Sequence, residues 1–316
     1  MNDDIMKYEL PAKITGYFPE ALSILTSIED SAVFHEDHNL SHPGDLFLLT
    51  FNDVIECAHR LATRVNCEVE NIRITRHIED EKIDAIRIEV FSFLFYCANF
   101  IESCQSIIKS LFKDGGKDKA FTRAAREFTD NTRSYREQIS KIINLIKHQH
   151  RRIRPFSFSW ENNLIVGYFV EGLLAPNVLG PDPQVHKQHN GLNTGISINR
   201  DIPYHLVNVY FASACLASVV KKYAKITTKS HPNLSGDHVE KCLEEVSKLK
   251  LILLPDEFTK ELPTITNKSE GKFCLEMPSK KTPHNAKPHP ATVSLNARIG
   301  ISNRSFAPLY MLPQNG

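Results

Sequence analysis

The sequence lacks an excess of one charge, a long apolar run and any closely paired cysteines. Its 316 residues include 38 Lys and Arg against 37 Asp and Glu, so the overall charge does not favour nucleic acid or an anionic membrane as a partner. The most apolar stretches, 90–100 and 206–220, are shorter than the ~20 residues that cross a bilayer. The first residues are acidic where a secretory signal is basic. We therefore expect no membrane span and no secretory signal.

The seven cysteines are an odd number and contain no C-x-x-C pair, which argues against a disulfide framework and a paired-cysteine zinc site. Cys97, Cys104 and Cys215 lie in apolar segments, where a thiol behaves as a small hydrophobic group. Reduced thiols indicate a cytoplasmic location. The sequence also has no glycine-rich phosphate loop and no serine nucleophile elbow, so we expect neither a cofactor nor a metal.

Hydrophobic residues make up 41% of the chain and charged residues 24%, which is ordinary for a globular protein with a sizeable core. Apolar spacing predicts a short helix over 51–65, and a loose alternation over 67–78 indicates a strand or an extended connector. The chain divides into an irregular N-terminal segment (1–50), a helical core (51–154), a β-hairpin with completing helices (155–260) and an extended or flexible tail (261–316).

Two long helices are the clearest prediction. Between 80 and 112 there is no proline or glycine, and apolar residues recur every three or four positions, which predicts an amphipathic helix. The glycines that follow can take the left-handed conformation that ends a helix. A second helix is expected over 118–152, and its inward positions alternate by four and three residues: Phe121, Ala125, Phe128, Thr132, Tyr135, Ile139, Ile142 and Ile146. Together the two helices predict a long αα-hairpin.

The pattern changes to period two after Pro155, and turn residues at 161–163 separate two strands, which predicts a β-hairpin at about 153–172. Two more helices are expected over 204–225 and 238–251. The predicted fold class is therefore mainly α: a helical bundle built on the long hairpin, with a small β-hairpin and a flexible C-terminal tail.

Polar residues gather near the end of the second long helix. On a helical projection Asn144, His148 and Arg151 lie within about 60° of one another, away from the apolar seam. An imidazole can move a proton from a ribose hydroxyl or to the leaving oxygen, and a guanidinium can hold the phosphate. An amide can orient the imidazole. These three residues are the candidate catalytic set for RNA cleavage without a metal.

The same stretch carries the densest basic patch of the chain. Its candidate substrate-binding residues are Lys147, His150, Arg152 and Arg154. The alternative is structural: basic residues at a helix C-terminus complement the negative end of the helix dipole, and a polar helix face is often only solvated.

Residues 143–148, Ile-Asn-Leu-Ile-Lys-His, resemble the motif of the HEPN superfamily, in which an arginine, a polar residue, three variable residues and a histidine lie late in a long helix. Asn144 and His148 match, whereas Ile143 stands at the arginine position, so an arginine of the next turn would have to replace it. The resemblance covers about residues 80–154. It implies a dimeric helical bundle from a bacterial defence or toxin–antitoxin system, in many members a metal-independent ribonuclease.

Three other groups have both a structural and a functional interpretation. The histidines and acids at 35–42 are either metal ligands or part of a surface loop. The aromatic residues that alternate over 156–160 either stack bases or pack as a half-buried strand. His186 and His189 lie in a proline-rich loop and Arg200 follows it, where each is able to contact a ligand.

Two functions remain open from the sequence. The first is contact with RNA or a nucleotide in the basic cleft of a homodimer, whose two-fold axis sets two copies of His148 side by side. The second is a non-catalytic scaffold or regulatory subunit, in which the helical hairpin or the tail binds a protein partner.

Overall fold

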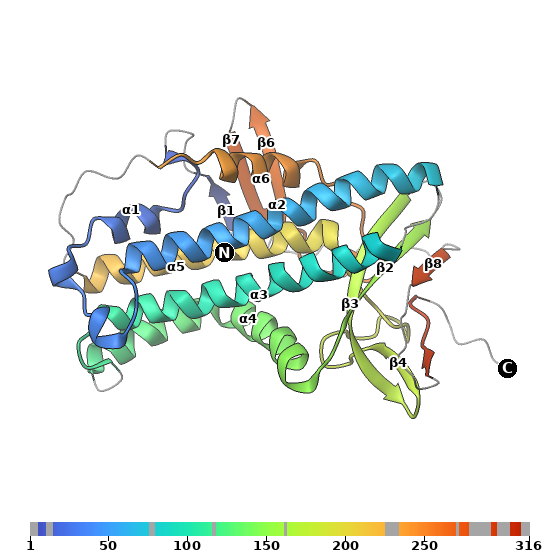
Figure 1. Ribbon diagram of the computed structural model, residues 1–316, viewed down its shortest axis with the longest axis horizontal. Helices are drawn as coiled ribbons and strands as arrows, with labels where there is room; N and C mark the ends of the chain where they lie inside the picture. The colour runs from blue at the N-terminus through green and yellow to red at the C-terminus, as the bar shows by residue number, and fades with distance from the viewer. Residues whose placement is uncertain are drawn as a thin grey trace, which may run out of the picture.

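The computed structural model describes residues 6–10, 15–75, 80–115, 118–160, 163–224, 234–269, 272–277, 292–295 and 304–310. Four long helices lie roughly along the longest axis, and the larger of two sheets closes one end (Figure 1). The described helices are α1 (Glu20–Thr26), α2 (Pro43–Thr75), α3 (Asp80–Ser110), α4 (Lys119–Gln149), α5 (Ile198–Tyr223) and α6 (Asp237–Ser247).

The strong helix predictions hold, with shifted ends. Helix α3 spans nearly the expected range. Gly115 has a positive φ of 49°, but it lies in the turn after the helix rather than at the helix end. Asp118 caps the start of helix α4, and its side chain accepts a hydrogen bond from the Ala120 amide. It ends at Gln149, three residues before the predicted end, because His150 takes the left-handed conformation. Most of the predicted inward face is buried, including Phe128, Thr132, Tyr135, Ile139 and Ile142.

Two predictions were wrong in the region of helix α2. The short helix expected over 51–65 extends from Pro43 to Thr75, so 67–75 is helical rather than a strand or connector, and the N-terminal segment is not irregular throughout. Pro43 suits the first helical position because its missing N–H has no helical acceptor there. Val69 is buried one turn after buried Val65, so the apparent alternation was the continuation of the same helix face.

The bundle is not built on a single hairpin. Helices α3 and α4 are consecutive and in contact, but α3 packs more extensively on α2 than on α4. Helix α5 contacts all three. The architecture is therefore a four-helix layer with a mixed sheet at its end, and the class is mainly α only in this looser sense.

Helix α5 is the central element of the bundle. It begins at Ile198 rather than at the predicted residue 204, and Pro203 lies inside the helix near its beginning. By length and composition α5 is apolar enough to cross a membrane, but 78% of its most apolar window is buried within the protein. That burial fits the core helix of a soluble protein.

The larger sheet has the order β8–β2–β3–β4–β9, with β5 (Ile196–Ser197) paired to β3. The predicted β-hairpin is present: β2 (Ile153–Trp160) pairs antiparallel with β3 (Asn163–Ala175). Strands β4 (Val178–Pro181) and β9 (Ser305–Phe306) pair in parallel, which makes the sheet mixed.

Strands from the tail belong to both sheets, so of the two alternatives, extended or flexible, these segments are extended. Strands β6 (Thr264–Ser269) and β7 (Lys272–Met277) pair with each other, and β7 also pairs with β1 (Met6–Glu9) near the start of the chain. Strand β8 (Thr292–Leu295) lies beside β2. Backbone pairing over such sequence distances is not encoded in local periodicity. Of the other tail residues, 261–263 and 304–310 are also described, and the rest lie outside the described part of the chain.

The aromatic strand face of β2 packs inside the protein. Phe156 and Phe158 are buried with Ile165, Phe169, Leu254 and Leu309 in a second core cluster between the sheet and the C-terminal segments. The packing interpretation therefore holds for these two rings. The Trp160 side chain lies outside what the structure describes.

Candidate functional site

The end of α4 exposes part of the predicted catalytic set. Asn144 and His148 are both exposed, one helical turn apart on the same face. Lys147 is also exposed, and its ammonium group lies 4.6 Å from the centroid of the Phe95 ring of α3. His150, exposed as well, ends the helix with φ 54°.

Arg151 does not share that face, because it lies beyond the end of the helix. Its backbone N–H donates to the Leu145 carbonyl at 3.2 Å. Its side chain turns to the buried carboxylate of Asp182, with Nε 3.2 Å from Oδ2, although the two atoms do not form a well-aligned hydrogen bond. The predicted triad is therefore reduced to Asn144 and His148, with the guanidinium held elsewhere.

The other predicted basic residues differ in availability. Arg154 is buried and its Nε donates to Glu171 at 2.6 Å, so most of its charge is already compensated. Arg152 is exposed, and no carboxylate of the described residues forms an ion pair with it. Lys147, His148, His150 and Arg152 are thus the exposed members of the predicted patch.

A groove of about 520 Å³ lies between the first half of α3 and the α4–β2 junction. Asp84 is the one carboxylate among its described lining. Four arginines also line it: Arg87, Arg151, Arg152 and Arg154. Asp84 pairs with Arg87 at 3.2 Å. We call this feature the arginine groove. Arg87 could not be found from the sequence, since only the packing of α3 brings it to residues far along the chain.

Partly buried aromatic rings lie at and next to the arginine groove. Phe91 lines it, and the Phe91 and Phe95 rings of α3 lie 6.2 Å apart with an interplanar angle of 26°. Lys147 lies over the second ring. The exposed end of α4 and the arginine groove therefore form one continuous surface of cations and aromatic rings.

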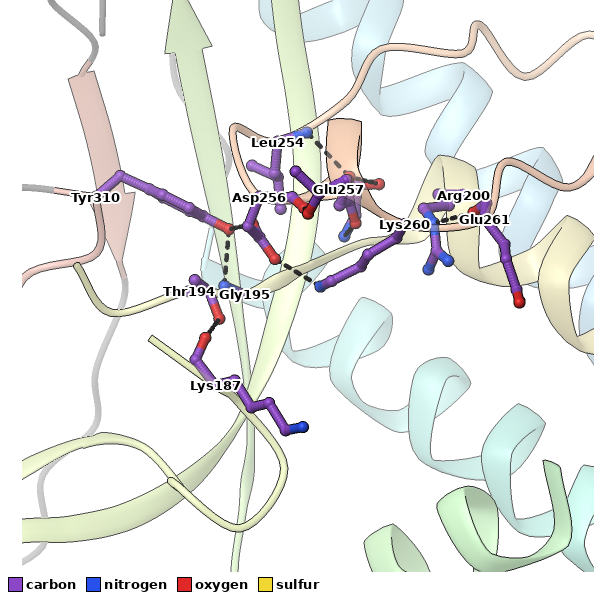
Figure 2. Close-up of polar contacts among 12 residues, drawn as sticks. Lys187, Thr194, Gly195, Arg200, Leu254, Asp256, Glu257, Lys260, Glu261 and Tyr310 are labelled. Atoms are coloured by element: carbon purple, nitrogen blue, oxygen red, sulfur yellow. Dashed lines mark hydrogen bonds and ion pairs between the residues drawn. The ribbon is translucent and has the colours of Figure 1, made fainter. Parts of the chain in front are cut away.

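A second concave site lies farther from the C-terminal end of α4, next to residues 134–142. This cleft has a volume of about 630 Å³ and is enclosed by α4, the start of α5, the loop 184–196 and residues 256–261. Figure 2 shows part of its wall, including Lys187, Arg200 and Lys260. The described lining residues of the cleft and the arginine groove do not overlap.

The floor of the cleft contains a buried polar network around Asp201. Tyr168 donates a hydrogen bond to Asp201 Oδ2 at 2.8 Å, and His205 Nε2 lies 3.4 Å from Oδ1. The other ring nitrogen of His205 bonds to the Tyr135 hydroxyl at 2.9 Å. Burial alone would raise the pKa of the Asp201 carboxyl, but His205, Tyr168 and Arg200 outweigh it and lower that pKa below its ordinary value. Asp201 is therefore a buried carboxylate that stays ionised.

A second set of contacts braces the wall of the cleft (Figure 2). Asp256 binds Lys260 at 2.5 Å and accepts a hydrogen bond from the Tyr310 hydroxyl at 2.7 Å. The same hydroxyl accepts the Gly195 amide at 2.8 Å, so the C-terminal segment is tied to the loop. Glu257 accepts bonds from Ser197 and Leu254, while burial raises the pKa of its carboxyl.

The remaining candidates separate into structural and lining residues. His186 is buried and its Nε2 accepts the Val170 amide at 2.9 Å; burial, reinforced by the charge of Lys260, lowers its pKa to about 3, so it stays neutral. His189 of the loop and Arg200 of the first turn of α5 both line the cleft. The histidines and acids at 35–42 do not gather as a metal site, and among the described residues no three His, Cys, Asp or Glu side chains do.

His38 and His42 have local roles instead. His38 Nε2 bonds to the Phe112 carbonyl at 2.8 Å, and His42 Nδ1 accepts the Gly44 amide at 3.1 Å.

The resemblance around His148 finds no second support from known proteins: no protein-family model, no curated protein and no solved structure matches the chain.

Proposed function

We propose that the protein binds single-stranded RNA along the arginine groove and the exposed end of α4. The observation that carries the proposal is the groove lining, which gathers four arginines, although carboxylates hold three of them. Arg152 and the neighbouring Lys147 are exposed, and no carboxylate of the described residues forms an ion pair with either, so they are the cations open to a ligand. Guanidinium groups bind phosphate oxygens through paired N–H donors.

The aromatic rings beside the groove favour RNA over a simple anion. Phe91 and Phe95 pack against the core but keep part of their surface exposed, and bases of a single strand stack on such rings with little dependence on sequence. Lys147 lies over the Phe95 ring, and Arg152 lines the groove together with Phe91. Both cations are exposed, so they supply contacts to the phosphates on which affinity depends.

The test is the salt dependence of RNA binding. The double variant Lys147→Gln, Arg152→Gln removes two exposed cations without emptying a buried site. We expect weaker binding of a fluorescent single-stranded RNA, and a slope of log affinity against log salt reduced by about 0.7 for each lost contact. Lys241→Gln is the matched control, because Lys241 is an exposed helical lysine of α6 without an ion pair to any described residue. An unchanged slope in the double variant would contradict the proposal.

Cleavage of RNA is a second candidate, favoured by the exposure of His148 one turn from Asn144. A lone imidazole can exchange a proton, but the guanidinium expected beside it, Arg151, is occupied by Asp182. In this proposal a homodimer packed across the α4 ends supplies a second His148. Loss of labelled RNA cleavage in EDTA on His148→Ala, with His150→Ala as the control, would support it.

The HEPN resemblance alone places this activity in a bacterial defence or toxin–antitoxin system. The competing proposal is a non-catalytic scaffold or regulatory subunit that binds a protein partner through its helices or tail. Absence of both RNA binding and cleavage at any protein concentration would favour that alternative.

A further inference from the structure

The cleft is a second concave site, and its described lining is separate from that of the arginine groove. Three cations that reach it come from three elements: Lys141 from α4, Lys187 from the loop and Arg200 from α5. None of the three is within ion-pair distance of a carboxylate in the described part of the chain. In Figure 2 the Arg200 guanidinium and the Lys187 ammonium group are both directed toward the open space of the cleft.

Arg200 is the built part of this site. It is only 8% exposed, its Nε donates to the Glu261 carbonyl at 2.9 Å, and its guanidinium lies 5.4 Å from the centroid of the Tyr204 ring. These contacts hold the guanidinium plane in place while its terminal nitrogens remain available as donors. A fixed, nearly buried guanidinium is a costly group to maintain without an anionic ligand.

The carboxylates of the cleft do not cancel these cations. Asp201 is engaged by Tyr168 and His205, and Asp256 is engaged by Lys260 and Tyr310. Glu261 is left as the one carboxylate of the described lining without a side-chain partner, against three unpaired cations. The cleft therefore has a surplus of positive charge directed at its interior.

We propose that this cleft binds a small molecule carrying a phosphate monoester, with Arg200, Lys141 and Lys187 contacting the phosphate. A monoester carries close to two negative charges at neutral pH and accepts several hydrogen bonds, which matches three converging cations. The volume of about 630 Å³ suits a ligand the size of a mononucleotide. The amide oxygen of Gln138 accepts a hydrogen bond from the Tyr204 hydroxyl at 2.7 Å. Its NH₂ group is left to donate to the organic part of the phosphate monoester.

The experiment is calorimetric titration of the full chain with adenosine 5′-monophosphate, adenosine and inorganic phosphate. We expect the monophosphate to bind and adenosine to give no heat at about millimolar concentration. The double variant Lys141→Gln, Lys187→Gln should weaken monophosphate binding at least about tenfold, since each lysine loses a charge-assisted contact. Both lysines are exposed, so this variant avoids the folding risk of replacing Arg200.

Two controls separate this proposal from RNA binding. Lys241→Gln and the double variant Lys147→Gln, Arg152→Gln should both leave monophosphate binding unchanged. Equal binding of adenosine and its monophosphate, unchanged affinity in Lys141→Gln, Lys187→Gln, or no heat from any phosphate compound would overturn the proposal. So would binding of a 5′-phosphorylated RNA, but not of the monophosphate, through the same two lysines, because the ligand would then be an RNA end.

Discussion

The buried Asp201 network makes a sharp prediction about stability. In Tyr168→Phe the carboxylate loses the hydroxyl that donates to Oδ2 at 2.8 Å, while the ring and its packing remain. Asp201 is 5% exposed, so water has little access to replace the lost donor. A hydrogen bond to a charged group contributes about 1.5–3 kcal/mol. We therefore expect Tyr168→Phe to lower the free energy of unfolding by about 2 kcal/mol.

A matched control exists in the same core. Tyr210 is also buried, but its hydroxyl donates to a neutral acceptor, the Tyr17 carbonyl, at 2.9 Å. Because bonds between neutral groups contribute only about 0.5–1.5 kcal/mol, Tyr210→Phe should cost roughly half as much as Tyr168→Phe. Urea unfolding followed by circular dichroism measures both. Equal losses in the two variants would show that the charge of Asp201 adds nothing.

The pH dependence of the same pair tests the ionisation of Asp201. Its folded pKa is lowered from the ordinary 3.8, so its contribution to stability is present above pH 3.8 and is lost as pH falls through the lower folded value. Removing the Tyr168 hydroxyl raises the folded pKa. The loss of unfolding free energy caused by Tyr168→Phe should accordingly be largest above pH 3.8 and become smaller below it. The loss caused by Tyr210→Phe should not change with pH. A deficit in Tyr168→Phe that does not change with pH would contradict an ionised Asp201.

Two further predictions concern buried groups. His186 has a folded pKa of about 3, below its ordinary 6.5, so the unfolded chain takes up the proton first and stability falls as pH drops below 6.5. When the pH is lowered from 6.5 to 4.5, the free energy of unfolding of His186→Gln should fall by about 2–3 kcal/mol less than that of the unmodified protein. Urea unfolding at both pH values measures this difference, and an equal fall in the two proteins would contradict the assignment. Gly236 packs directly on the backbone of Gly16, so a Cβ there has no space. Gly236→Ala should destabilise the protein by about 3 kcal/mol in thermal or urea unfolding, and an unchanged stability would disprove the close approach.

The helices were predictable where one apolar face continues over many turns. Over 80–110 the period is unbroken, and short-range sterics and burial favour the same structure. The second half of α2 was missed because Val69, with branched neighbours after it, also fits a strand over a short window. The end of α4 depended on one backbone conformation, that of His150, which the helical period does not reveal.

The candidate site was predictable only where its residues belong to one helix. Asn144 and His148 share a face because they are four residues apart in a helix, and the structure exposes both. Arg151 was placed beside them by extending the helix, and it lies instead against Asp182 from a distant strand–loop junction. The arginine groove needed Arg87, and the cleft needed three separate segments to converge on Arg200.

Local periodicity and composition determined by themselves that this chain forms long amphipathic helices, a β-hairpin and a basic, polar helix end. Tertiary structure alone decided which cations remain available, since a guanidinium such as Arg154 is neutralised or left open by residues remote in sequence. It also decided that the tail completes two sheets. The physical reason is that helical patterns arise from contacts within a few residues, whereas ion pairing, cavities and strand pairing arise from contacts between distant segments.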